Sequence, residues 1–399
     1  MTRLAADPEQ IATALRARGC VTPALVIDLA QVERNIAAMI AHLGGPERWR
    51  PHVKTIKQAR IVTMLLAAGV RHFKCATIPE LRMVVDAAAR FGADVDVLLA
   101  YPIARARIGE LVALAHAAPH ATIGVTGDDP DHLEAILDAD PRSGPLVGWI
   151  DVDVGMHRTG SPAATWLRWA ERARRPIAGV HAYEGHLGWD DRAAAAQCYG
   201  ELGALVRAVG PCRWLVTSGS LAFDHALASP SLRPGDGDGD GDGDGHGWLH
   251  QIGAGTLVLV DVASTVPARS IGAAPSTYVA ARVVARPGPG RITLDAGSKA
   301  LAPDRPPPNC TVLGKPDWRP QRPSEEHLPV LVDDRETPAR DEIVLLVPDH
   351  VCTTVNLYRE AIYLRDGVPC GRGPIDAGGR EAQPDAAPEG GPHLDGASR

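Results

Sequence analysis

Short apolar runs alternate with alanine-rich, helix-periodic segments over most of the chain. The eight runs are residues 49–53, 72–76, 95–100, 122–126, 147–152, 177–183, 213–217 and 251–257. Strands of a buried parallel sheet are nearly continuous in apolar residues, and the segments between these runs are long enough for crossover helices. The pattern therefore predicts an α/β fold, a (β/α)8 barrel of the TIM type, with an open doubly wound sheet as the alternative.

The segment before the barrel has a different pattern. Residues 1–20 carry Asp7-Pro8-Glu9, which is typical of a helix start, and residues 22–28 have the composition of a strand. Residues 29–43 repeat apolar side chains at helical spacing. We expect residues 1–28 to join a second, β-rich domain, because the barrel pattern begins only after them.

The sequence pattern changes after residue 262. Strand-like runs separated by Pro, Gly and Asp turns predict a second, mostly antiparallel β domain over residues 263–376. The runs are residues 279–286, 291–295, 330–332, 341–347 and 360–364. The Gly-Asp repeat at residues 235–247 predicts a flexible acidic insert in the 29–262 barrel, since the paired glycines of a calcium-binding repeat are absent. Residues 377–399 predict a disordered tail.

Composition limits the function classes. The chain has 399 residues, of which 45% are hydrophobic and 4% aromatic, and its net charge is −7. This acidic balance argues against a nucleic-acid partner, and no run of roughly 18 apolar residues predicts a membrane span. Seven scattered cysteines without a CxxC pair, and an N-terminus without an apolar signal core, predict a cytoplasmic protein with reduced thiols.

Polar residues gather where the barrel runs end, which is the face that carries the active site in such barrels. Lys54 follows the first run directly. A lysine here is either a solvated residue in a turn or an amine that forms a Schiff base with an aldehyde. Arg158 and Tyr183 follow the fifth and sixth runs. Together with a phosphate site, these residues favour pyridoxal 5'-phosphate (PLP) as cofactor.

The phosphate site is expected in the loops of the seventh and eighth runs. Glycines there let backbone N–H groups approach an anion, and hydroxyls donate hydrogen bonds to it. The candidate residues are Thr217, Gly219, Ser220, Gly255 and Thr256.

His350 and Cys352 are the candidate metal ligands in the second domain. They are two residues apart, so on an extended segment both would face one side. Imidazole and thiolate suit Zn²⁺, whereas a buried cysteine beside a hydrogen-bonded histidine is the structural alternative. Two ligands leave positions open for water and substrate, which predicts a catalytic ion.

The chain resembles the D-threonine aldolase / D-serine dehydratase family, which are fold-type III PLP enzymes with an alanine-racemase-like barrel. The resemblance covers about residues 20–375 and is carried by residues 50–55 (RPHVKT), 73–77 (FKCAT), 98–102 (LLAYP), 153–158 (DVGMHR), 325–327 (EEH) and 348–352 (PDHVC). It implies that Lys54 carries PLP, that Tyr183 lies at the cofactor and that Gly255 and Thr256 hold its phosphate. It also implies metal binding by His350 and Cys352, and a homodimer.

Four departures bear on the substrate. The family usually has histidine at Ile56 and an aromatic residue at Leu257, and some dehydratases have a tyrosine near Asp190 that is missing here. Cys352 stands where the aldolases usually have aspartate. The resemblance thus implies a Zn²⁺-dependent (alternatively Mn²⁺ or Mg²⁺) dehydratase of D-3-hydroxy amino acids such as D-serine, D-threonine or D-3-hydroxyaspartate. A D-threonine-type aldolase and a non-catalytic PLP-binding protein remain alternatives.

Overall fold

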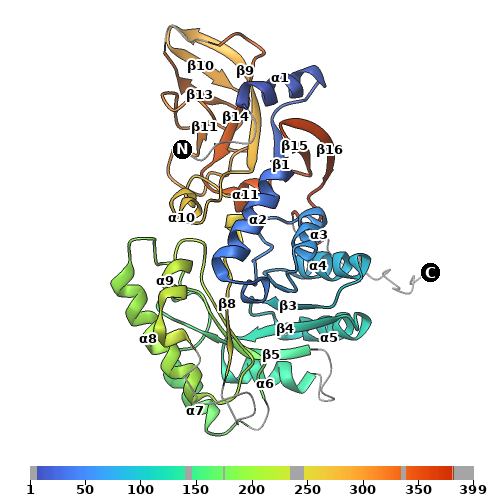
Figure 1. The fold of residues 1–399 in the computed structure, drawn as a ribbon, viewed down its shortest axis with the longest axis vertical. Coiled ribbons are helices and arrows are strands. Elements are labelled where there is room, and N and C mark those ends of the chain that lie inside the picture. The colour runs from blue at the N-terminus through green and yellow to red at the C-terminus, as the bar shows by residue number, and fades with distance from the viewer. Residues whose placement is uncertain are drawn as a thin grey trace, which may run out of the picture.

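The computed structural model describes residues 7–139, 146–173, 176–233, 247–333, 338–379 and 381. Its strands form two separate sheets, one curled within a layer of helices and one lying beyond it (Figure 1). Most of the predicted insert at 235–247 and of the predicted tail at 377–399 lies outside the described residues. Among the described helices, none is both long and apolar enough to cross a bilayer.

The first sheet is parallel throughout and confirms the predicted barrel architecture. Its seven strands pair in chain order: β2 (His72–Cys75), β3 (Val95–Leu99), β4 (Ala121–Gly127), β5 (Leu146–Val152), β6 (Gly179–Ala182), β7 (Trp214–Thr217) and β8 (Leu249–Ile252). Parallel pairing in sequence order is what repeated crossover helices produce. The eighth predicted run was placed too late, because its end forms a short 3-10 helix, η4 (Thr256–Val258).

The first predicted run, residues 49–53, is not a regular strand. Trp49 makes a single parallel bridge to Ile252 of β8, and His52 makes one to Lys74 of β2. Pro51 lies between the two bridging residues, and proline has no N–H to donate to a sheet ladder. The run therefore connects the two edges of the sheet and closes the barrel with few hydrogen bonds.

Helices surround the barrel sheet. They are α2 (Leu29–Leu43), α3 (Ala59–Ala67), α4 (Ile78–Phe91), α5 (Ile108–Ala117), α6 (Pro130–Ala139), α7 (Ala163–Ala170), α8 (Arg192–Ala208) and α9 (Phe223–Ala228), with 3-10 turns η1 (Pro46–Arg48), η2 (Arg105–Arg107) and η3 (Pro230–Leu232). Helix α10 (Thr265–Ser270) follows the barrel in sequence and lies nearer the second sheet (Figure 1). Helix α2 has the predicted bounds. Asp28 accepts from the backbone of Ala30 at its start, and Gly44 ends it in a left-handed conformation.

The second sheet is mostly antiparallel, as predicted. It contains β1 (Ala24–Asp28), β9 (Thr277–Gly288), β10 (Arg291–Leu294), β11 (Cys310–Val312), β12 (Arg319–Pro320), β13 (Leu328–Leu331), β14 (Ile343–Pro348), β15 (Glu360–Arg365) and β16 (Val368–Pro374). Strand β1 pairs antiparallel with β9 and parallel with β15, although it precedes the barrel in sequence. Helices α1 (Pro8–Ala17) and α11 (Val351–Val355) accompany this sheet.

Buried polar side chains join the barrel to the second sheet. Asn35 of α2 is fully buried and donates to the backbone oxygens of Val258 and Ala274, at 3.1 and 2.8 Å. Asp261, just after η4, accepts from the backbone N–H of Val351 at 3.0 Å. That N–H belongs to the first residue of α11, which has no partner within the helix. The barrel thus caps the helix that contains Cys352.

Candidate functional site

Lys54 and Lys57 have different environments although they share one turn. The Lys54 Nζ lies 5.6 Å from the centroid of the Tyr183 ring. Lys57 is buried, and its Nζ forms a 2.7 Å ion pair with Glu80 and donates to the backbone oxygen of Ala377 at 3.1 Å. Lys57 is therefore occupied in the packing of the fold, and Lys54 is the lysine of this turn that faces a cavity.

The same turn is held by the C-terminal part of the described chain. The Ala377 N–H donates to the Lys57 oxygen at 3.1 Å, and Asp376 accepts from the backbone of Ala59 at 2.8 Å, at the start of α3. Ala377 is buried. This residue belongs to the fold, although the predicted disordered tail begins with it.

A cavity of about 200 Å³ lies where the first barrel run and strands β2, β3, β5 and β6 end. Tyr183, which follows β6, is central to it. Lys54 Nζ, Lys74 Nζ and the Arg158 guanidinium carbon lie 5.6, 5.7 and 4.5 Å from its ring centroid. Cations are attracted to the face of an aromatic ring, so Tyr183 organises three positive side chains around one space.

Two lining residues were missed from the sequence. Lys74 of β2 is 1% exposed, and burial, followed by the charge of Lys54, lowers the pKa of its ammonium to about 7. His181 of β6 places Nδ1 2.8 Å from Asp151 Oδ1, and its buried Nε2 has no hydrogen-bond partner among the described residues. Both are polar residues in apolar runs, and the run pattern alone does not reveal which face they occupy.

The predicted phosphate loops meet each other. The Thr256 N–H donates to Ser220 Oγ at 3.2 Å, which joins the loop after β7 to that after β8. A Cβ at Gly219 would lie 3.1 Å from the Tyr183 ring. Thr217 is separated from this contact, because its hydroxyl is buried 2.8 Å from His250 Nε2. The structure thus brings Gly219, Ser220 and Thr256 together near Tyr183.

A buried carboxyl supports the loop after β7. Glu184 accepts from the Tyr199 hydroxyl at 2.9 Å and from the Ser218 N–H at 3.3 Å. Ser218 has a φ of 77°, which a residue other than glycine rarely adopts. Burial raises the pKa of Glu184. The hydrogen bond from the Ser218 N–H to Glu184 fixes the left-handed turn that precedes Gly219 and Ser220.

The metal motif differs from the predicted extended segment. Residues 351–355 form α11, and His350 is the residue that precedes its first turn. His350 and Cys352 are nevertheless adjacent, and their hydrogen bond is the main cause that raises the pKa of His350 to about 9. Burial disfavours the Cys352 thiolate, but the His350 hydrogen bond and charge outweigh it and lower the thiol pKa. The lowered pKa shifts Cys352 toward the thiolate, the form that binds metals.

A carboxylate orients the histidine of this pair. Asp304 Oδ2 lies 2.5 Å from His350 Nδ1, so Nε2, on the other side of the ring, is the nitrogen that could bind a metal together with Cys352. Such carboxylate–histidine contacts are common around metal ions. In the described part of the chain, no group of three or more His, Cys, Asp and Glu side chains is arranged to hold an ion. His350 and Cys352 would supply two ligands, and the remaining coordination positions of an ion held there would be open.

Cys352 reaches the barrel. Its Sγ lies 3.1 Å from Thr55 Oγ1 and 3.6 Å from Thr256 Oγ1. Thr55 follows Lys54 directly, and Thr256 lies in the loop after β8. The second sheet therefore places its candidate metal ligand beside both the candidate cofactor lysine and the candidate phosphate loop.

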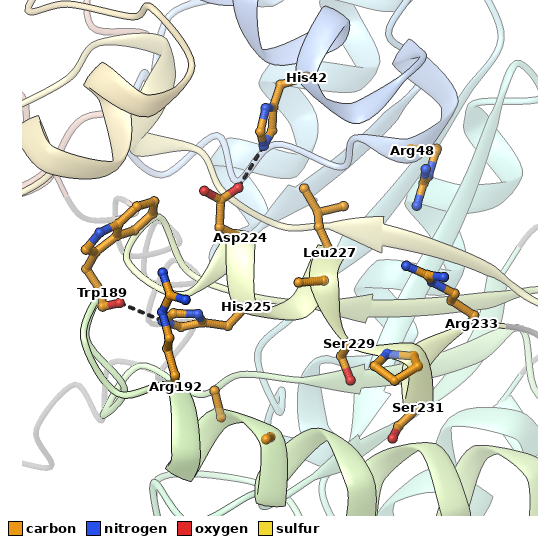
Figure 2. A pocket seen from close by; sticks show the side chains of 14 residues that line it. His42, Arg48, Trp189, Arg192, Asp224, His225, Leu227, Ser229, Ser231 and Arg233 are labelled. Carbon is orange, nitrogen blue, oxygen red and sulfur yellow. Dashed lines mark hydrogen bonds and ion pairs between the residues drawn. The ribbon is translucent and has the colours of Figure 1, made fainter.

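A larger cavity, of about 970 Å³, lies elsewhere, between α2, α8 and α9. Figure 2 shows His42 directed at Asp224 and His225 directed at the backbone oxygen of Trp189. Both hydrogen bonds are 2.7 Å long. The histidines of this cavity thus already have partners. The smaller cavity contains three cationic side chains and the His181 Nε2, which has no partner among the described residues. It is therefore the better candidate for a ligand-binding site.

The small cavity fits PLP in its donor set. Lys54, Lys74 and Arg158 form no ion pair with any described carboxylate, so an anionic ligand would compensate their charge. Glycine at position 219 leaves the space next to the Tyr183 ring open. Ser220 and Thr256 do not line the cavity itself, but they meet beside that glycine and bring hydroxyl groups there. These residues would hold the phosphate, and Lys54 the aldehyde.

Comparisons with known proteins agree with the two-domain fold. The alanine racemase N-terminal domain family matches residues 27–235, and the putative serine dehydratase domain family matches residues 276–364. D-threonine aldolase from Arthrobacter sp. is 28% identical over 363 residues, which is 87% of this chain and 90% of that protein. D-threo-3-hydroxyaspartate dehydratase from Delftia sp. (strain HT23) is 30% identical over 141 residues, 35% of each chain.

A solved structure has the same fold. The crystal structure of D-threonine aldolase from Filomicrobium marinum superposes with a TM-score of 0.76 at 23% identity and covers 90% of this chain and 95% of its own. At this identity the similarity establishes the fold of both domains.

Gly255 is expected to be essential for the fold itself. A Cβ here would lie 2.2 Å from the backbone oxygen of His52, in the run that closes the barrel. Gly255→Ala should lower the free energy of unfolding by about 1–3 kcal/mol, as overpacking does, even without cofactor. Denaturant unfolding of the cofactor-free protein would measure this. Gly200→Ala is the control, because nothing lies within 4 Å of its Cβ. An unchanged midpoint for Gly255→Ala would contradict the expectation.

Proposed function

We propose that this chain, which belongs to the family with the alanine racemase N-terminal domain, is a PLP- and metal-dependent lyase that dehydrates D-3-hydroxy amino acids. The observation that carries the proposal is the position of Cys352, whose Sγ lies 3.1 Å from the hydroxyl of Thr55, next to Lys54. A metal held there would lie close to the cofactor lysine. We place the protein in the cytoplasm as a homodimer.

Lys54 has two roles in this proposal. Its Nζ would hold the cofactor aldehyde, and as a free amine it would take the proton from the substrate Cα. Bound PLP supplies an aromatic ring that accepts the negative charge left at that carbon. Arg158 and Tyr183 position the reactive groups, because the guanidinium lies against the tyrosine ring and limits its movement.

His350 and Cys352 would hold the metal ion, with Asp304 fixing the imidazole. A bound Zn²⁺ supplies Lewis-acid polarisation of the substrate 3-hydroxyl, which makes hydroxide a feasible leaving group. Elimination of water would yield an enamine, which tautomerises to an imine, and a water molecule then hydrolyses the imine to a 2-oxo acid and ammonia. The thiolate-favouring environment of Cys352 supports a soft ion such as Zn²⁺ over Mn²⁺ or Mg²⁺.

Retro-aldol cleavage to glycine and an aldehyde is the second candidate. It is favoured by the similarity to D-threonine aldolase over 87% of this chain, whereas the match to the dehydratase covers 35%. It would use the same residues, but a base must then take the hydroxyl proton. Cys352 supports the dehydratase, because by resemblance the aldolases have aspartate there. A PLP-binding protein without catalysis is the alternative of another class.

A substrate panel separates these candidates. D-serine, D-threonine and D-3-hydroxyaspartate should each be assayed for 2-oxo acid with ammonia and for glycine with aldehyde. We expect 2-oxo acid to be the main product for at least one of them, with the L-isomers as controls. Glycine as the main product would favour the aldolase, and the cofactor's absorbance without any turnover would favour the non-catalytic alternative.

Lys54 should be the residue that binds the cofactor covalently. Borohydride reduction of the PLP-loaded protein followed by peptide mapping should label Lys54, because Lys57 is paired with Glu80. Lys54→Ala should lose the label, while Lys299→Ala, at an exposed position, should keep it. A label on Lys57 or Lys74 would contradict the assignment.

Removal of the metal should abolish turnover and leave the fold intact. Two protein ligands do not hold the structure together as a closed four-ligand zinc site does. Chelated protein and Cys352→Ala should therefore keep the PLP absorbance and the thermal midpoint. Asp304→Asn should weaken metal binding on the order of 10- to 100-fold, since it loses the carboxylate that orients His350. Cys370→Ala, at an exposed cysteine, is the control. Unfolding on chelation, or full activity without metal, would refute this role.

A further inference from the structure

Lys74 is a buried amine whose role the proposed mechanism leaves open. It lies in β2, is 1% exposed, and lines the cavity with Lys54, Arg158 and Tyr183. Its Nζ forms no hydrogen bond or ion pair with another described residue. The two carboxylates that act on it are already engaged, Asp151 with His181 and Glu184 with Tyr199. A buried ammonium without a partner is costly unless a ligand supplies one.

The residue that follows strand β8, which flanks the closing run on the side opposite β2, is a glycine that leaves room for the Lys74 amine. A Cβ at Gly253 would lie 2.3 Å from Lys74 Nζ, so any larger residue would displace the lysine. Gly253 follows β8 directly and precedes Gly255 and Thr256 by two and three positions. Lys74 therefore ends beside the segment that leads into the candidate phosphate loop.

The cavity contains more positive than negative charge. Lys54, Lys74 and Arg158 surround Tyr183, and none of them is paired with a described carboxylate. His181 adds no cation, because burial lowers its pKa, and its Nε2 remains a hydrogen-bond acceptor. An anion in this cavity would gain the interactions that these three donors do not make within the protein.

We propose that Lys74 is a cofactor-binding residue whose ammonium donates hydrogen bonds to PLP at the inner end of the cavity, in the space kept open by Gly253. This inference rests on the proposed function, because it requires that the cavity binds PLP. The acceptor is either the phosphate or the aromatic ring of the cofactor. Both are hydrogen-bond acceptors, and the experiment below separates them.

Cofactor binding should then be coupled to a proton. The groups that face Lys74 are the cations Lys54 and Arg158, the carboxylates Asp151 and Glu184, and the imidazoles His52 and His181. Burial, then Lys54, lowers the Lys74 pKa to about 7 in the free site. A bound anion stabilises the protonated amine and raises that pKa. Binding above about pH 7 must therefore take up a proton, and this contribution to affinity weakens as the pH rises.

Lys74→Met tests the proposal without relying on activity. Methionine is an unbranched side chain one atom shorter than lysine and carries no charge, so the cofactor-free protein should be as stable as the wild type or more stable. PLP affinity, from absorbance titration near pH 7, should fall on the order of 10- to 100-fold. Calorimetry in buffers of different ionisation enthalpy should show less proton uptake than the wild type.

Two further variants make the result specific. Gly253→Ala keeps Lys74 but places a methyl group against its Nζ, so it should also weaken PLP binding, and it decides the question if Lys74→Met does not fold. Lys315→Met, a lysine of the second sheet paired with Glu9, should bind PLP as the wild type does.

Pyridoxal, which lacks the phosphate, identifies the acceptor. If Lys74→Met weakens the binding of PLP but not of pyridoxal, the amine contacts the phosphate. If it weakens both, the amine contacts the ring. Equal PLP affinity and equal proton uptake in wild type, Lys74→Met and Gly253→Ala would overturn this inference alone, whereas a wild type that binds no PLP would overturn the proposed function with it.

Discussion

Residues 49–53 close the barrel through a few backbone hydrogen bonds, and this closure determines where Lys54 lies. The Arg50 N–H donates to Ile252 on one side, and the Val53 N–H donates to Lys74 on the other. Because Pro51 interrupts the ladder, side-chain contacts must fix the run as well. Trp49 donates to the Ala254 oxygen at 2.8 Å, and Arg50 pairs with Asp96 at 2.6 Å. Both side chains are fully buried, so contacts in the interior of the barrel hold the closing run in place.

The second sheet contributes to the site through short, specific contacts. Asp261 caps α11, and α11 directs Cys352 at Thr55 and Thr256. An error of one residue in this connection would turn Cys352 away from the barrel, because side chains along a helix rotate by about 100° per residue. The candidate cofactor residues and the candidate metal ligands belong to two different domains. The buried hydrogen bond between Asp261 and the start of α11 therefore keeps them in register with each other.

Much of this arrangement follows from sequence pattern, for identifiable reasons. The helix at 29–43 has a capping aspartate, a helical apolar period and a terminal glycine, so local signals agree with the structure. Lys54 was recognisable because it ends an apolar run. The helix that contains Cys352 could not be recognised from the sequence. It has five residues, and it is stabilised by Asp261, which is 90 positions away in sequence. Lys74 and His181 were missed since barrel strands are apolar on both faces, and periodicity does not distinguish an inward polar residue.

The contact between Lys57 and Ala377 has a consequence for the biosynthesis of the protein. These residues are 320 positions apart, and Asp376 also caps the helix that follows the Lys54 turn. A ribosome-bound chain that already contains every barrel strand still lacks the residues that fasten this turn. The contacts of Ala377 and Asp376 with this turn can therefore form only after the last strands have been made.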